Sequence, residues 1–150
     1  MKRLLTVVAF GAIALTTAAA PSHVDRAGKP TITVYKDPDC GCCKNWIEHL
    51  IKHGYIVKVN DTRELKKVKR SLGVPEKLEA CHTALVGAYL VEGHVPADDI
   101  DRLLKTTPKI AGIAVPGMPA GSPGMEMGAK QPYSVISFDR AGKTAVFARH

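Results

Sequence analysis

The chain has 150 residues, a formal net charge of +7, and aromatic residues that make up only 5% of the sequence. The length predicts a single domain. The positive charge could indicate a nucleic-acid partner, but the basic residues at 66–70 lie among Leu65, Val68 and Leu72, as on the solvent-facing side of an amphipathic helix. The few aromatic side chains also offer no stacking platform for single strands. We therefore do not expect the chain to bind nucleic acid.

The first 20 residues have the pattern of a secretory signal peptide. A basic start, Lys2-Arg3, precedes an apolar run at 4–15 and three alanines at 18–20, which favour cleavage after Ala20. Removal of the two basic residues lowers the formal charge from +7 to +5. The apolar run is short for a membrane span, so we expect no stable membrane insertion after cleavage. The expected location of the mature chain is the periplasm.

The rest of the chain divides into a short lead-in and one domain. Residues 21–30 are polar with Gly and Pro, and we expect them to be flexible. His23 in this segment could touch a metal ion, although a lone histidine in such a tail is more often solvated. Residues 31–150 are expected to form one domain, whose elements follow.

Hydrophobic alternation and helical periodicity predict a mixture of strands and helices in this domain. The expected strands cover 31–35, 55–60, 83–87, 89–95, 133–139 and 144–148, with a short buried piece at 110–115. The expected helices cover 42–53, the stretch from Asp61 or Thr62 to Gly73, and a short run that opens at Pro96. This order is that of a thioredoxin-like fold. The expected class is α/β, with a central mixed sheet flanked by helices and a C-terminal Gly/Pro/Met loop and hairpin.

Three cysteines fall within four positions at the expected start of the first helix. Cys40, Cys42 and Cys43 follow a turn at 36–39. The positive end of the helix dipole favours thiolate over thiol, and thiolate is both the nucleophile and the soft-metal ligand. Cys81 stands just before the third strand, where redox members of the fold commonly carry a cis-proline close to the same corner. We therefore expect Cys81 to face the other three thiols.

Two other uses of the cysteines stay open at this point. In an exported protein they could form two structural disulfides, and the only sensible pairing joins Cys40 to Cys43 and leaves Cys42 for Cys81. Cys40 and Cys43 also form a C-x-x-C frame that would suit a thiol–disulfide oxidoreductase. Against that activity, Cys42 inside the frame and Cys81 near it would trap the reactive pair in wrong disulfides.

The chemistry of the cluster favours copper over zinc. Thiolate and thioether sulfur are soft ligands that select Cu(I), whereas zinc usually takes two separated ligand pairs in tetrahedral geometry. Three thiols in four residues cannot readily bind one tetrahedral ion together, but they can share several ions by bridging. We therefore expect a multinuclear Cu(I) site, with zinc as the less favoured competitor.

Four blocks of sequence, taken together, resemble one known family. They are CGCCKxW at 40–46, ACHTA at 80–84, VEGHVPA at 91–97, and GIAVPGMP at 112–119 followed by GSPGME at 121–126. The combination resembles the small exported metal-binding proteins of CopG type, which are associated with copper resistance. The resemblance implies a thioredoxin-like fold whose cysteines hold copper as a thiolate-bridged cluster. It also implies a role in copper redox handling, alongside other periplasmic copper-handling proteins as partners. An oxidoreductase activity is a hypothesis for this role, and no catalytic residues are assigned to it.

The same blocks contain three further candidate ligands. His94 stands at the end of an expected strand beside Gly93, and Met118 and Met125 belong to two Pro-Gly-Met units of a long loop at 116–128. Thioether sulfur suits Cu(I), although such methionines could equally cover apolar surface. The predicted metal ligands are Cys40, Cys42, Cys43, Cys81, His94, Met118 and Met125.

The remaining histidines and Met127 have weaker claims to the site. His82 follows Cys81 on a strand, so its side chain is expected to point to the opposite face and to be structural. His49 and His53 are expected to lie on a solvated helix face.

Overall fold

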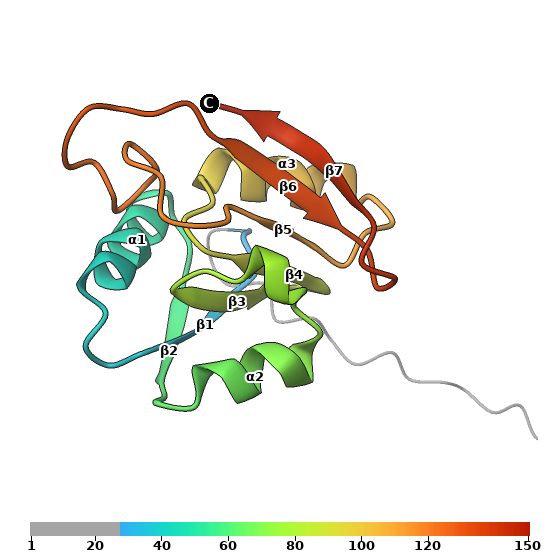
Figure 1. The fold of residues 1–150 in the computed structure, drawn as a ribbon, viewed down its shortest axis with the longest axis horizontal. Coiled ribbons are helices and arrows are strands. Elements are labelled where there is room, and N and C mark those ends of the chain that lie inside the picture. The colour runs from blue at the N-terminus through green and yellow to red at the C-terminus, as the bar shows by residue number, and fades with distance from the viewer. Residues whose placement is uncertain (1–27) are drawn as a thin grey trace, which may run out of the picture.

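The computed structural model describes residues 28–150, which form one mixed sheet of seven strands with helices on both faces (Figure 1). The strands are β1 (Ile32–Lys36), β2 (Val57–Asp61), β3 (His82–Val86), β4 (Tyr89–Glu92), β5 (Gly112–Ala114), β6 (Ser134–Phe138) and β7 (Thr144–Arg149). The helices are α1 (Gly41–Lys52), α2 (Leu65–Leu72), the short 3-10 helix η1 (Glu76–Leu78) and α3 (Ala97–Thr106). The predicted α/β class, with a mixed sheet and a C-terminal hairpin, is confirmed.

The strands lie in the order β2-β1-β3-β4-β5-β6-β7. β1 pairs in parallel with β2 and antiparallel with β3, and β3 forms the expected hairpin with β4, in which Val86 lies opposite Tyr89. The order of the first four strands is consistent with the thioredoxin-like prediction. β5 continues the sheet in parallel with β4, and β6 and β7 complete it as an antiparallel pair.

Each face of the sheet has its own apolar core. Trp46 of α1 and Leu103 of α3 belong to the core on one face, which also contains Val34 of β1. Leu78 of η1 packs with Leu90 of β4 on the other face. The alternation of side chains along each strand explains this division.

Trp46 is the anchor at the base of the cysteine loop. Its side chain is fully buried, and its indole N–H donates a hydrogen bond of 2.8 Å to the carbonyl oxygen of Val95. A buried indole of this size contributes about 3 kcal/mol of hydrophobic stabilisation. This contact therefore fixes α1, and the cysteines at its start, against the end of β4.

The largest differences from the predicted bounds are at the end of β4 and the start of α2. β4 stops at Glu92 because Gly93 adopts a left-handed conformation, with φ of +71°, that turns the chain. α2 begins later than predicted because Asp61 still pairs with Lys36 of β1. The hydroxyl of Thr62 then accepts a hydrogen bond from the backbone N–H of Glu64, before the helix starts.

The predicted signal peptide at 1–20, and the lead-in as far as residue 27, lie outside the described residues. Within 28–150, none of the helices has the length and apolar character needed to cross a membrane.

Candidate metal centre

The start of α1 presents three of the predicted ligands. Cys40 is the N-cap residue, and Cys42 and Cys43 lie in the first turn of the helix. The preceding turn is closed by the backbone N–H of Asp39, which donates to a carboxylate oxygen of Asp37 at 2.9 Å. Because the first N–H groups of a helix have no partner within it, this end favours negative charge on nearby groups.

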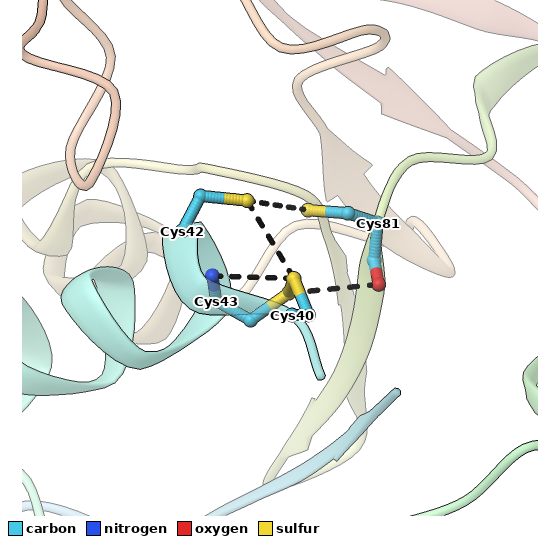
Figure 2. A group of neighbouring side chains, drawn as sticks. All are labelled: Cys40, Cys42, Cys43 and Cys81. Carbon is cyan, nitrogen blue, oxygen red and sulfur yellow. Dashed lines mark hydrogen bonds between the residues drawn. A yellow bond between two sulfur atoms is a disulfide. The ribbon is translucent and has the colours of Figure 1, made fainter. Parts of the chain in front are cut away.

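β3 delivers Cys81 to the same corner. Lys36 at the end of β1 lies opposite His82 at the start of β3, so the residue before β3 lies beside the cysteine loop. The sulfur of Cys81 is 4.0 Å from that of Cys42, which in turn is 3.5 Å from the sulfur of Cys40 (Figure 2). All four cysteine sulfurs lie within 4.8 Å of one another. The expectation that Cys81 faces the other three cysteines is confirmed.

Cys40 and Cys43 form a disulfide, with a Cα–Cα distance of 5.4 Å, whereas Cys42 and Cys81 are free thiols. This is one half of the structural-disulfide alternative, because the second pairing, Cys42 with Cys81, is not formed. Cys43 is fully buried, while Cys42 and Cys81 are partly exposed. The disulfide form therefore offers two thiols to a metal ion, and its reduction would make four available.

His94 directs a ring nitrogen at this cluster. Its Nε2 atom lies 3.0 Å from the sulfur of Cys81, and its Nδ1 atom lies 2.7 Å from the carbonyl oxygen of Pro123. A carbonyl oxygen can only accept, so Nδ1 carries the proton and Nε2 has the lone pair. Burial also lowers the pKa of His94, which keeps the ring neutral. The ring is thus held in the form that binds a metal ion.

His82 lies beside Cys81 instead of pointing away from it, so the expectation from strand alternation is wrong. Its Nδ1 atom is 3.3 Å from the sulfur of Cys81, and its ring packs on Trp46 with centroids 4.2 Å apart. The alternation rule fails here because β3 begins at His82, and Cys81 lies in the bend before the strand. Ligand atoms of Cys81, His82 and His94 therefore form a second group within 4.8 Å.

Comparisons with known proteins identify the family. Residues 78–125 match the model described as "Protein of unknown function, DUF411". Two solved structures, named copper resistance protein CopG Form 1 and Form 2, each share 44% sequence identity with the chain. The chain belongs to the CopG family. Form 1 covers 81% of this chain and 98% of its own at a TM-score of 0.77, and Form 2 covers 80% and 97% at 0.76. No curated protein sequence matches the chain.

This membership confirms the resemblance predicted from the four sequence blocks. The matched family segment, 78–125, contains Cys81 and both buried histidines, and it reaches Met125 at its end. The likeness to the CopG structures also takes in the cysteine loop, because it covers four-fifths of the chain.

The Cys81 thiol is strongly protonated in its present surroundings. Burial, and next the neighbouring Cys42 thiol, raises the pKa of Cys81 to about 12. A metal ion must therefore displace a proton to bind this sulfur. The lone pair of His94 Nε2 accepts the hydrogen bond of the thiol. The displaced proton must pass on to solvent, because a protonated His94 could not bind the ion.

The loop with the methionines is packed against the site. Gly124 approaches the backbone of α1 so closely that a Cβ atom there would lie 2.8 Å from the backbone nitrogen of Trp46. Figure 1 shows this loop, drawn in orange, beside α1. Met118 is 51% exposed and Met125 is partly buried, whereas Met127 is 90% exposed. The cysteines and His94 thus converge in the structure, and metal contact by Met118 or Met125 stays a prediction.

The two histidines on α1 have different surroundings. His53 is exposed, as expected, but His49 is half-buried and its Nε2 atom accepts a 3.1 Å hydrogen bond from the backbone N–H of Ala97. His49 therefore caps the first turn of α3, a role that helical periodicity alone did not indicate.

Proposed function

We propose that the chain is a periplasmic copper-binding protein of copper resistance and homeostasis, which holds Cu(I) in its multi-cysteine site. The observation that carries this proposal is the convergence of three soft or borderline donor atoms at one corner. The sulfur of Cys81 lies 4.0 Å from that of Cys42 and 3.0 Å from Nε2 of His94. The names of the CopG structures, which are copper resistance proteins, support copper as the metal.

Cu(I) fits these donors better than zinc does. Thiolate sulfur selects Cu(I), and neutral imidazole is acceptable to it. When the Cys40–Cys43 disulfide is reduced, sulfurs only 3.5–4.0 Å apart are spaced for ions that bridge neighbouring thiolates. We infer that the reduced site is multinuclear. Zinc remains the competitor, since two cysteines and one histidine can also hold it with a fourth ligand.

Export to the periplasm is the second part of the proposal. It rests on the signal-peptide pattern at 1–20 and on the Cys40–Cys43 disulfide, which suits an oxidising compartment. There the disulfide would set how many thiolates are available to copper. A finer hypothesis is that the site interconverts Cu(I) and Cu(II) and that the protein works with other copper-handling proteins.

One observation favours a different function. The disulfide joins Cys40, at the N-terminus of a helix, to Cys43, which is the arrangement of a thiol–disulfide oxidoreductase. The sulfur of Cys42 is only 3.5 Å from that of Cys40, however, and would compete with any substrate thiol. Copper binding is therefore the better supported function.

Titration of the fully reduced mature protein with Cu(I) under anaerobic conditions tests the proposal. We expect more than one Cu(I) per chain, and X-ray absorption should show sulfur ligands with short copper–copper vectors. A single copper ion with only nitrogen and oxygen ligands would contradict the proposal.

The Cys81→Ser variant separates copper binding from the oxidoreductase alternative. Its copper stoichiometry should fall, because Cys81 supplies one of the converging sulfurs. A dithiol enzyme needs only Cys40 and Cys43, so its disulfide reductase activity on insulin would survive the change. Strong reductase activity, with copper binding indifferent to Cys81→Ser, would favour the oxidoreductase.

A further inference from the structure

A fully buried ion pair lies behind the metal centre. Lys69 of α2 donates to a carboxylate oxygen of Glu92 at the end of β4, and the two side chains are 2% and 0% exposed. Removal of two charges from water offsets most of their attraction, so apolar residues of the same shape often stabilise a fold as well. The second carboxylate oxygen, Oε2, makes no hydrogen bond of ordinary geometry among residues 28–150, although the Thr83 hydroxyl, opposite Glu92 on β3, interacts with the carboxylate. A pair with these properties is poorly explained by stability alone.

The carboxylate of Glu92 has a second donor, which is the backbone next to Cys81. The N–H of Ala80 donates a hydrogen bond of 2.6 Å to the same oxygen that accepts from Lys69. Ala80 lies between η1 and β3, where neither helix nor strand fixes the chain. This hydrogen bond therefore sets the path of the backbone immediately before the cysteine.

The main chain around Glu92 fixes the direction of the other proposed ligand, His94. The N–H of Val115 donates to the carbonyl oxygen of Glu92 at 2.9 Å, and the N–H of Gly93 donates to the carbonyl oxygen of His82 at 3.1 Å. Gly93 is packed so tightly that a Cβ atom would lie 2.6 Å from the Val115 oxygen. The end of β4 is therefore rigid, and His94 leaves it in a fixed direction.

We propose that Glu92, with Lys69 as its buried counter-charge, is the positioning residue that brings Cys81 to His94. Its side chain holds the backbone before Cys81, and its own strand holds His94, so one residue sets the 3.0 Å separation of sulfur and Nε2. A carboxylate is suited to this task because a single oxygen accepts from both Lys69 and Ala80. The positioning itself concerns the metal-free protein. Only its consequence, the effect on Cu(I) affinity, rests on the proposed metal function.

Two double variants separate the hydrogen bond from the ion pair. Lys69→Met with Glu92→Gln removes both charges but keeps a side-chain oxygen that can accept from Ala80. Lys69→Met with Glu92→Leu removes both charges and this acceptor. Changing Lys69 in both variants avoids a buried, unpaired ammonium group, which would destabilise any fold.

The first measurement is metal-free. In a background of Cys40→Ser and Cys43→Ser, a mild oxidant should join Cys42 to Cys81, whose sulfurs are 4.0 Å apart. The rate of this cross-link reports the position of Cys81. We expect the Glu92→Gln double variant to cross-link within threefold of the unaltered rate, and the Glu92→Leu double variant to be at least tenfold slower.

The second measurement is Cu(I) affinity, by competition with a chromophoric chelator, with all four cysteines present. The Glu92→Gln double variant should retain its affinity, and the Glu92→Leu double variant should lose at least tenfold. If the unaltered chain binds no Cu(I) but the cross-link rates differ as expected, the metal function fails and the positioning role stands. Native cross-linking and native affinity in a folded Glu92→Leu double variant would overturn the positioning role.

A backbone substitution covers the case in which the Glu92→Leu double variant does not fold. Replacement of Ala80 by its α-hydroxy acid turns the amide into an ester and deletes only the N–H that donates to Glu92. Lys69 and Glu92 then stay paired in the core. We expect the same loss of cross-linking rate and of affinity, and an unchanged rate with unchanged affinity would overturn the proposal.

Discussion

The two nitrogens of the His94 ring face different partners. Nδ1 donates to the carbonyl oxygen of Pro123, and Nε2 is left to face the sulfur of Cys81. The neighbouring His82 is held less firmly, because its buried Nε2 atom makes no hydrogen bond of ordinary geometry among the described residues. Its Nδ1 atom nonetheless lies 3.3 Å from Cys81. At the scale of single residues, His94 is prepared for a metal ion, and His82 is available to one.

We predict that His82→Phe weakens copper binding without weakening the fold. Phenylalanine keeps the packing on Trp46 and removes a buried polar atom that lacks a partner, so the free energy of unfolding should stay the same or rise by about 1 kcal/mol. Loss of a nitrogen ligand should lower Cu(I) affinity about tenfold, or about 1.4 kcal/mol. Urea denaturation and chelator competition measure the two quantities. His53→Phe, on the exposed side of α1, is the control, and equal copper affinity in both variants would show that His82 is no ligand.

Single residues were predictable where their chemistry stands out in the sequence. The cysteine spacing and the position of Cys81 before a strand were enough to predict that the four sulfurs meet. His82 was missed because the exact start of β3 decides where its ring points, and strand ends are not defined by alternation. The role of Glu92 was not predicted, because nothing in its neighbours indicates that it is buried against Lys69, 23 residues away.

At the scale of elements, the site forms where a helix, a strand end and a loop meet. The type and order of the helices and strands followed from periodicity, which is a local property. The contact of the loop at 116–128 with α1 did not follow, because it depends on Gly124, whose φ is +84° and whose missing side chain leaves room for the helix. Such a close approach between distant segments has no local signature. Its consequence is that Pro123 reaches His94.

We predict that Gly124→Ala displaces this loop. The new methyl group would lie 2.8 Å from the nitrogen of Trp46 and 2.9 Å from the carbonyl oxygen of Cys42, so the loop must move away from α1. The His94–Pro123 hydrogen bond should then weaken, and Cu(I) affinity should fall several-fold. Hydrogen exchange should become faster over residues 119–126.

Gly128→Ala is the matched control for this change. Gly128 has a similar φ of +88°, but nothing lies within 4 Å of the position that a Cβ atom would take. The backbone penalty of about 1 kcal/mol is therefore shared, and only the steric conflict with α1 differs. Equal exchange rates and equal copper affinities in the two variants would show that the contact with α1 does not hold the loop over the site.

At the scale of the whole molecule, the fold buries two neutral histidines side by side. The rings of His82 and His94 have centroids 5.0 Å apart, and both side chains are fully buried. Burial lowers the pKa of each ring, and for His82 the neighbouring His94 lowers it further. The two rings meet because His82 begins β3, His94 follows the end of β4, and these strands are antiparallel neighbours. Their shared burial connects the stability of the whole domain to pH.

We predict that the metal-free domain loses stability as the pH falls below about 6.5. The unfolded chain takes up protons on both histidines near that pH, whereas the folded domain keeps them neutral, so the unfolded state binds more protons. Each histidine should lower the free energy of unfolding by about 1.4 kcal/mol per pH unit, and the effect should vanish above about pH 7.5. Urea denaturation of the metal-free protein between about pH 7.5 and about pH 5 measures this slope.

The His82→Phe variant shows whether the histidines cause that slope. Burial raises the pKa of Glu92, so protonation of this carboxylate favours the folded state and opposes the histidines at the acid end. The unaltered chain alone therefore reports a sum of opposite effects. In His82→Phe the Glu92 contribution remains, and the slope below about pH 6.5 should fall by up to about 1.4 kcal/mol per pH unit, the share of one histidine. Identical slopes in the two proteins would show that burial does not keep His82 neutral in the folded chain.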